Sequence, residues 1–221
     1  MSKFLFVIPP FWGHINPTLS IGGTLLERGH DVAWAGMTTL NMKLFPSGAK
    51  YFYMEKTESK NKKEIEQIIL LQNKGANMPA LEALKLGLED TYIPFAKMMI
   101  DEFNEIVEQY KPDVIVNDCI TFVGGLSARL KNISFATITP ITPNALNDPQ
   151  SAPKVTEWVH KSIIDLQRFV GIDGDEEFVQ SQLLNMYYTS QLFCGLDDSS
   201  VPPYMKFIGA LTGRPDNTPF D

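Results

Sequence analysis

Short apolar runs alternate along this chain with longer stretches in which apolar residues recur every three or four positions. Runs of strand length lie at 3–8, 112–118 and 134–139, and shorter candidates lie at 31–35 and 50–54. Buried parallel strands have nearly unbroken apolar runs, because helices cover both faces of their sheet. This alternation predicts an α/β fold of the Rossmann-like, doubly wound kind, with a mainly parallel sheet.

Amphipathic stretches predict the helices that cover the sheet. One begins near Ile15, and a second spans 62–71. The stretch 81–110 has helical periodicity that Pro94 interrupts, since proline removes a backbone donor and clashes with the preceding turn. We therefore expect two helices or one kinked helix there. The remaining expected elements are helices at 122–130, 154–170 and 176–188 and a short strand at 191–195.

A histidine follows the first predicted strand. His14 lies in the loop that leads from Pro9 into the first helix, directly after Gly13. Ligands of open α/β sheets bind outside the carboxyl ends of the strands, where this loop is expected. An imidazole at that edge is a candidate general base. A single histidine near a strand end is also commonly a structural loop residue, so its position alone leaves both interpretations open.

A carboxylate ends another apolar run. Asp118 closes the pattern at 112–118, and a predicted helix follows it. If this strand neighbours the first, Asp118 reaches the same edge as His14. A carboxylate that accepts the imidazole N–H fixes the tautomer and stabilises the imidazolium formed on proton abstraction. The alternative role for Asp118 is a helix N-cap, which is common for aspartate.

The residues around His14 resemble a known family. Phe6–Pro9, Gly13–Pro17 and Leu25–Val32 are similar to the amino-terminal half of family 1 glycosyltransferases, most like the bacterial macrolide and zeaxanthin type of the UDP-glycosyltransferase superfamily. Lys206–Ala210, with Arg214 close behind, is similar to the segment where that family's first domain gives way to its second. The family more often has proline where Ala210 stands.

The resemblance implies roles for particular residues. In that family the histidine of the Gly-His-x-x-Pro stretch, here His14, deprotonates the acceptor hydroxyl, and the aspartate after the Pro-Asp-Val-Ile-Val strand, here Asp118, partners it. The expected reaction transfers a hexose with inversion to a hydroxyl of a hydrophobic small molecule. Residues that follow the predicted strand ends are expected to bind the acceptor: Phe11, Trp12, Gly13, Phe122 and Ile141. Phe11 and Trp12 also fit a plain packing role.

The resemblance also implies a second domain. The family carries its nucleotide-sugar signature there, with a His-Gly-Gly-type diphosphate loop, and these 221 residues contain nothing like it. We therefore expect residues 1–221 to be the amino-terminal acceptor-binding domain, one half of a GT-B fold, inactive alone. Its partner is a nucleotide-sugar domain in cis or in trans. No resident cofactor is implied, since UDP- or TDP-hexose is a co-substrate bound mainly by that domain.

Composition narrows the class further. A net charge of -7 and a pI near 5.0 argue against nucleic-acid binding, which needs a basic face. Two cysteines are too few for a disulfide framework and favour a reduced, cytoplasmic protein. No run approaches the roughly 18 apolar residues of a membrane span, so a transmembrane segment is not expected. The lysines at 56–63 indicate a solvated face and leave peripheral membrane contact as the minority interpretation.

Other chemistries find no motif. The first loop lacks the Gly-x-Gly-x-x-Gly of a dinucleotide site, no Gly-x-Ser-x-Gly elbow is present, and the histidines and cysteines show no metal-ligand spacing. Two alternatives stay open: a non-catalytic acceptor- or lipid-carrier-binding module or split subunit, and an unrelated doubly wound protein whose His14 and Asp118 never meet. The reading frame after Asp221 would distinguish the first alternative from an ordinary two-domain enzyme. The geometry of His14 and Asp118 would test the second.

Overall fold

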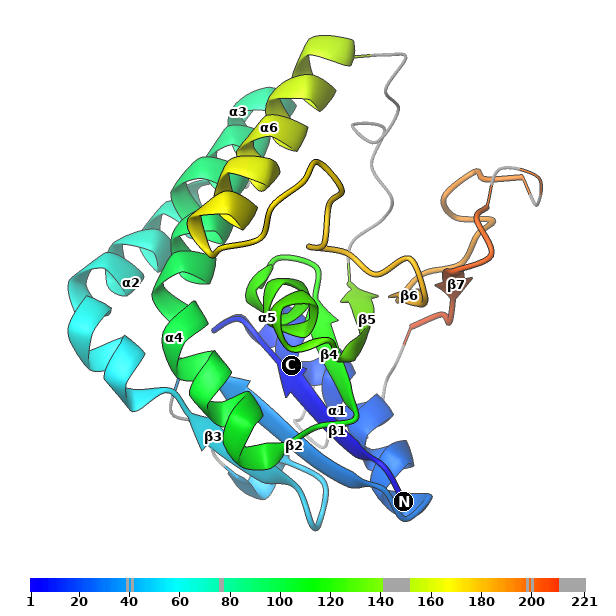
Figure 1. Cartoon of the computed structure of the whole chain (residues 1–221). Helices are drawn as coiled ribbons and strands as arrows, with labels where there is room; N and C mark the ends of the chain where they lie inside the picture. The colour runs from blue at the N-terminus through cyan, green and yellow to red at the C-terminus, as the bar shows by residue number, and fades with distance from the viewer. Residues whose placement is uncertain are drawn as a thin grey trace, which may run out of the picture.

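A computed structural model describes the chain except for positions 39, 41, 76–77, 141–151, 198, 200 and 211–221. In the described part, seven strands form a single open sheet (Figure 1). They are β1 (Lys3–Val7), β2 (Asp31–Gly36), β3 (Lys50–Tyr53), β4 (Val114–Asp118), β5 (Ser134–Thr139), β6 (Asn185–Tyr187) and β7 (Met205–Phe207). The order is β3-β2-β1-β4-β5-β6-β7, and each neighbouring pair is parallel. The predicted α/β class with a parallel sheet is confirmed.

Helices cover both faces of this sheet (Figure 1). One core cluster joins Leu5, Val7 and Ile115 to helices on the α4 side, and the other joins Phe6 and Val116 to α1. Alternate residues of each strand therefore serve opposite faces, as a doubly wound sheet requires. The helices are α1 (Trp12–Glu27), α2 (Glu55–Gly75), α3 (Ala80–Gly87), α4 (Ile93–Tyr110), α5 (Val123–Lys131) and α6 (Pro153–Phe169), with a π-helix, η2, at Leu88–Tyr92 and a 3-10 turn, η1, at Met42–Leu44.

Helix α1 is held closely against β2. A Cβ atom on Gly22 would collide with the indole of Trp34, so only glycine permits this approach. The same indole N–H donates to the Thr18 hydroxyl at 2.9 Å. Because Trp34 is fully buried, both contacts fix the rotation of α1, and with it the direction in which the first turn of the helix points.

Helix α5 approaches the sheet just as closely. A Cβ on Gly124 would lie 2.7 Å from Cγ1 of Val7 and 2.9 Å from Cβ of Asn117. The backbone N–H of Gly124 also donates to the Asn117 side chain at 3.1 Å. The first turn of α5 is thus fixed to the end of β4.

Gly124→Ala is therefore expected to destabilise the fold by about 1–3 kcal/mol or more, because an added methyl overpacks a site that cannot expand freely. Gly13→Ala is the matched control, since a Cβ there meets nothing within 4 Å. Alanine in a helix should leave stability unchanged or raise it by up to about 1 kcal/mol. Urea unfolding followed by circular dichroism measures both, and equal stabilities for the two variants would contradict the packing.

Two expected elements are wrong. Residues 176–188 do not form a helix; most of the segment is irregular, and its end is β6. Buried side chains from elsewhere satisfy its backbone: Gln167 accepts from Phe178 N at 2.7 Å, and Asn117 donates to the carbonyl of Val179 at 3.0 Å. Residues 191–195 are turns instead of a strand, since Cys194 N bonds back to Gln191 O at 3.1 Å.

The interruption expected at Pro94 is confirmed, although its form is more specific than predicted. Pro94 lies in the first turn of α4, and the π-helix separates α4 from α3. The prolines and Ile141 after β5 fall at 140–153, of which 141–151 lie outside the described residues, as does Arg214. Within the described residues, no helix is both long and apolar enough to cross a membrane.

Candidate active site

The sheet order places the ends of β1 and β4 side by side. Connections from β1 and β4 leave toward opposite edges, so the gap between them is the topological switch point where such sheets bind ligands. Val7 pairs with Asn117, which puts Asp118 at the last position of β4 beside the start of the β1–α1 connection. His14 was expected in a loop, but it lies in the first turn of α1, because His14 N and Ile15 N already bond to the carbonyl of Phe11 at 2.9 and 3.0 Å.

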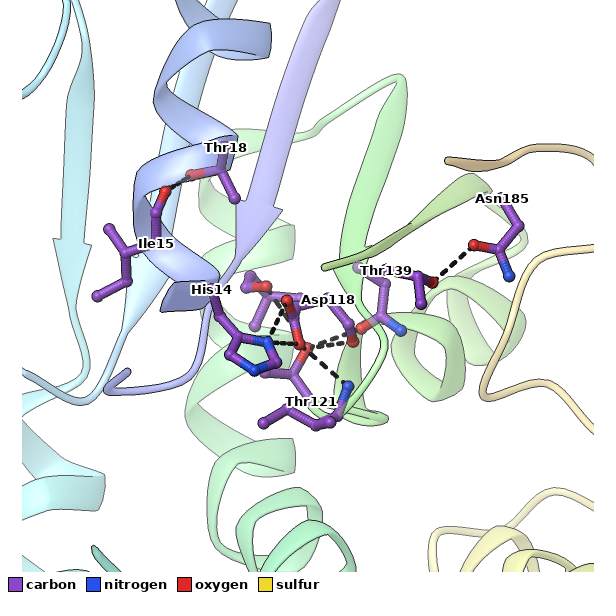
Figure 2. Close-up of polar contacts among 10 residues, drawn as sticks. His14, Ile15, Thr18, Asp118, Thr121, Thr139 and Asn185 are labelled. Carbon is purple, nitrogen blue, oxygen red and sulfur yellow. Dashed lines mark hydrogen bonds and ion pairs between the residues drawn. The ribbon is translucent and has the colours of Figure 1, made fainter. Parts of the chain in front are cut away.

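His14 and Asp118 are in direct contact (Figure 2). Nδ1 of His14 lies 2.9 Å from Oδ2 and 3.1 Å from Oδ1 of Asp118. The Asp118 side chain is fully buried, whereas that of His14 is 18% exposed. A carboxylate accepts the bond, so Nδ1 carries the hydrogen and Nε2 holds the free lone pair. The predicted contact is confirmed, and the alternative in which these side chains never meet is excluded.

Asp118 has a second hydrogen bond that holds its carboxylate in place. Oδ1 accepts from the backbone N–H of Ile120 at 3.0 Å. The N-cap role considered from the sequence is not observed, since α5 begins at Val123 and its cap has no side-chain hydrogen bond. The bond to Ile120 instead stabilises the turn between β4 and α5.

A cluster of buried polar side chains holds that turn in place. The hydroxyl of Thr121 lies 3.0 Å from both the Asn117 side-chain oxygen and the Asp118 carbonyl. Asn117, Asp118 and Thr121 are all fully buried. Their polar atoms are satisfied by one another and by the backbone, which makes a buried cluster rigid. The carboxylate therefore meets the imidazole in a geometry fixed before any ligand binds.

Of the other predicted site residues, only some lie beside His14. Phe11 lies beside the imidazole, with ring centroids 6.2 Å apart, and also contacts Phe95. Gly13 precedes His14 and has open space at its Cβ position. Phe122 is buried in the core cluster that Phe11 packs against. Trp12 is 48% exposed. Ile141 lies outside the described residues.

The chain is similar in sequence to known glycosyltransferases. No family model matches the chain. NDP-glycosyltransferase YjiC of Bacillus subtilis is 24% identical over 124 residues, 56% of this chain and 28% of the relative. 4'-demethylrebeccamycin synthase of Lentzea aerocolonigenes is 22% identical over 137 residues, 62% of this chain and 32% of the relative.

Solved structures extend the similarity to nearly the whole chain. The glycotransferase of kitacinnamycin aligns with 98% of this chain and 53% of its own, with a TM-score of 0.70 and 16% identity. CalG4, the calicheamicin glycosyltransferase, aligns with 95% of this chain and 52% of its own, with a TM-score of 0.60 and 16% identity. The chain has the fold of GT-B glycosyltransferases. It spans about a third of the curated relatives it matches and about half of these structures.

The GT-B resemblance seen in the sequence is thus confirmed, but sequence reasoning missed a thiol at the site. Sγ of Cys119 and the possible ligand atoms of His14 and Asp118 all lie within 4.8 Å of one another. Burial, and then the charge of Asp118, raise the pKa of the Cys119 thiol well above its ordinary value. Metal binding needs a thiolate, and Nδ1 of His14 is already bonded to Asp118. The cluster therefore fits a proton-transfer pair beside a neutral thiol better than a metal centre.

The only signal for Cys119 in the sequence was its place directly after Asp118. Local ligand spacing could not reveal the cluster, because positions 14 and 119 come together only through the sheet.

Proposed function

We propose that this chain is the acceptor-binding and general-base half of an inverting glycosyltransferase. Residues 1–221 act as the amino-terminal domain, and the enzyme moves a hexose from a nucleotide sugar to a hydroxyl of a hydrophobic small molecule. The observation that carries the proposal is the hydrogen bond between His14 and the buried Asp118 at the switch point of the sheet. A histidine that is hydrogen-bonded to a buried carboxylate in this way is suited to abstract a proton.

The reaction follows from the free nitrogen of the imidazole. Nε2 of His14 takes the proton of the acceptor hydroxyl while the hydroxyl oxygen forms a bond to the anomeric carbon. The bond from that carbon to the diphosphate oxygen breaks, and the nucleoside diphosphate leaves with the electron pair. Because attack and departure occur on opposite faces in one displacement, the anomeric configuration inverts. The carboxylate of Asp118 stabilises the imidazolium that forms.

Two structural neighbours support the substrate classes. SsfS6 has been solved in complex with thymidine diphosphate, with a TM-score of 0.56 to this chain. The spinosyn rhamnosyltransferase SpnG has been solved with spinosyn aglycone, with a TM-score of 0.51. This chain aligns with about half of each neighbour, 49% of the SsfS6 chain and 45% of the SpnG chain. We propose that a nucleotide-sugar domain, in cis or in trans, completes the enzyme.

On this proposal the 221-residue chain binds a hydrophobic phenol such as 2-naphthol weakly and shows no measurable transfer from UDP-glucose or TDP-glucose. Holding both substrates in register supplies roughly 7–11 kcal/mol of the barrier, and the groups identified here serve only the acceptor. Isothermal titration calorimetry measures the binding, and product chromatography measures transfer. Robust transfer by this chain alone would place the donor site within it.

A non-catalytic acceptor-binding module or a split-enzyme subunit has the same fold and passes the same binding test. These alternatives are distinguished by adding a nucleotide-sugar domain, either encoded in frame after Asp221 or supplied as a second polypeptide. An enzyme half gains acceptor-dependent transfer, and a split subunit gains it only with the separate polypeptide. A non-catalytic module gains none with either, and that result would refute the catalytic proposal.

A further inference from the structure

The π-helix before α4 gives one tyrosine an unusual position. In a π-helix residues five apart stack on one another, and η2 places Tyr92 over Gly87. A Cβ on Gly87 would lie 2.9 Å from the Tyr92 hydroxyl and 3.0 Å from Cζ. The wide turn is secured locally, since Ile93 N bonds to Leu88 O and the Thr91 hydroxyl donates to Leu86 O at 3.1 Å. A side chain at position 87 would therefore displace the phenol from this position.

This arrangement packs Tyr92 against the segment that follows Asp118. Its ring meets the edge of Phe122, with centroids 5.7 Å apart and planes at 71°, and Phe122 follows the turn that carries Asp118. Burial, and then the charges of Cys119 and Asp118, raise the pKa of Tyr92 to about 12. The phenol thus lies within electrostatic range of the carboxylate that holds His14, and it stays protonated throughout the neutral range.

The hydroxyl of Tyr92 has no hydrogen-bond partner within the described residues. Buried phenols normally find one, as Tyr51 does by donating to Thr38 O at 2.6 Å. Tyr188 also lies in the field of Asp118 and also lacks a partner, but its hydroxyl is sealed from solvent. The Tyr92 side chain is only partly buried, and its hydroxyl is not among the sealed ones. A bound molecule can therefore supply the missing partner.

We propose, on the basis of the function proposed above, that Tyr92 is a specificity-determining residue for the acceptor. Its phenol donates a hydrogen bond to an oxygen of the acceptor other than the hydroxyl that His14 deprotonates. Aromatic rings lie beside both polar groups: partly buried Phe11 is next to the imidazole of His14, and the Tyr92 ring packs against Phe122. Such rings favour a flat aromatic acceptor. The acceptor class is thus an aromatic aglycone that carries a second hydroxyl or carbonyl oxygen.

Calorimetric binding of naphthols to the 221-residue chain tests this pairing without any need for catalysis. The probes are 2-naphthol, which has one hydroxyl, and dihydroxynaphthalenes with a second hydroxyl at position 5, 6 or 7. Tyr92→Phe removes the donor and keeps the ring. We expect it to weaken binding of at least one dihydroxy isomer by about 3- to 10-fold, the worth of one neutral hydrogen bond, and to leave 2-naphthol unchanged.

Two further variants keep the test specific. Gly87→Ala displaces the phenol and should weaken the same preference. Tyr188→Phe is the matched control, because its hydroxyl lies in the same field but cannot be reached, and its binding profile should equal wild type. The proposal is overturned if Tyr92→Phe discriminates none of the isomers, if it weakens 2-naphthol equally, if Tyr188→Phe has the same effect, or if the wild-type chain binds no naphthol.

The failure of this inference can be distinguished from failure of the proposed function. The naphthol series reports on Tyr92 alone, since it involves no sugar transfer. Turnover of a His14→Ala enzyme reports on the base alone. Normal selectivity of Tyr92→Phe combined with an inactive His14→Ala enzyme would reject Tyr92 and retain the general base.

Discussion

Replacing His14 with alanine in the donor-complete enzyme is expected to lower turnover by about 100- to 10,000-fold, the usual contribution of a general base. In the proposed mechanism alanine removes the nitrogen that takes the acceptor proton, so the hydroxyl must attack while still protonated or lose its proton to water. The imidazole is 18% exposed, and the substitution also removes its bond to the buried Asp118, so folding of the variant is checked separately. Steady-state turnover with 2-naphthol and circular dichroism of the folded variant measure the effect.

His30→Ala is the matched control for that variant. His30 lies at the other edge of the sheet, where its Nδ1 accepts from Ser2 N at 3.2 Å and its ring meets Phe4 edge-on. These contacts are structural, so turnover should stay within about twofold of wild type, since surface changes have small effects. Full activity of the His14→Ala enzyme would remove histidine from the mechanism.

Asp118→Asn is the second large effect, and we expect turnover to fall by up to about 10,000-fold, as the same change does in a serine protease triad. The Asn oxygen can keep the bond to Ile120 N, which turns the side-chain NH₂ toward His14. An NH₂ donates, so Nδ1 must become the acceptor and the ring hydrogen moves to Nε2. The nitrogen that should take the proton is then occupied, and the negative charge beside the imidazolium is lost.

Asp113→Asn controls for removal of a carboxylate at the other end of the same segment. Asp113 Oδ2 accepts from Lys3 N at 2.8 Å at an exposed position. That variant should keep turnover near wild type. Kinetics of both variants, with urea unfolding to confirm that each is folded, measure the difference. Equal turnover of Asp118→Asn and wild type would show that the carboxylate only shapes the turn.

Patterns that depend on neighbours along the chain were readable from the sequence. Strands β1, β4 and β5 are buried on both faces, so their apolar runs are nearly unbroken, and their ends were predicted within one or two residues. Because parallel strands present their carboxyl ends to one edge, the meeting of His14 and Asp118 followed from two strand ends. The order of the strands, which makes β1 and β4 adjacent, was assumed instead of derived.

Features that depend on distant residues were not readable. The segment 176–184 has helical periodicity but is held irregular by Gln167 and Asn117, whose side chains reach it from other elements. The place of Tyr92 depends on the π-helix and on the absence of a side chain at Gly87. Tertiary contacts override local propensity in both cases. Local patterns in a single sequence do not reveal contacts between distant residues.

The dependence of the His14→Ala defect on the acidity of the acceptor tests the general-base role most directly. A base is needed most by a hydroxyl that holds its proton tightly and least by one that is already ionised. With the donor-complete enzyme at neutral pH, turnover should fall by about 100- to 10,000-fold for an aliphatic alcohol or 2-naphthol. It should stay close to wild type for 4-nitrophenol, which ionises near neutral pH without help. An equal loss with all three acceptors would contradict proton abstraction by His14.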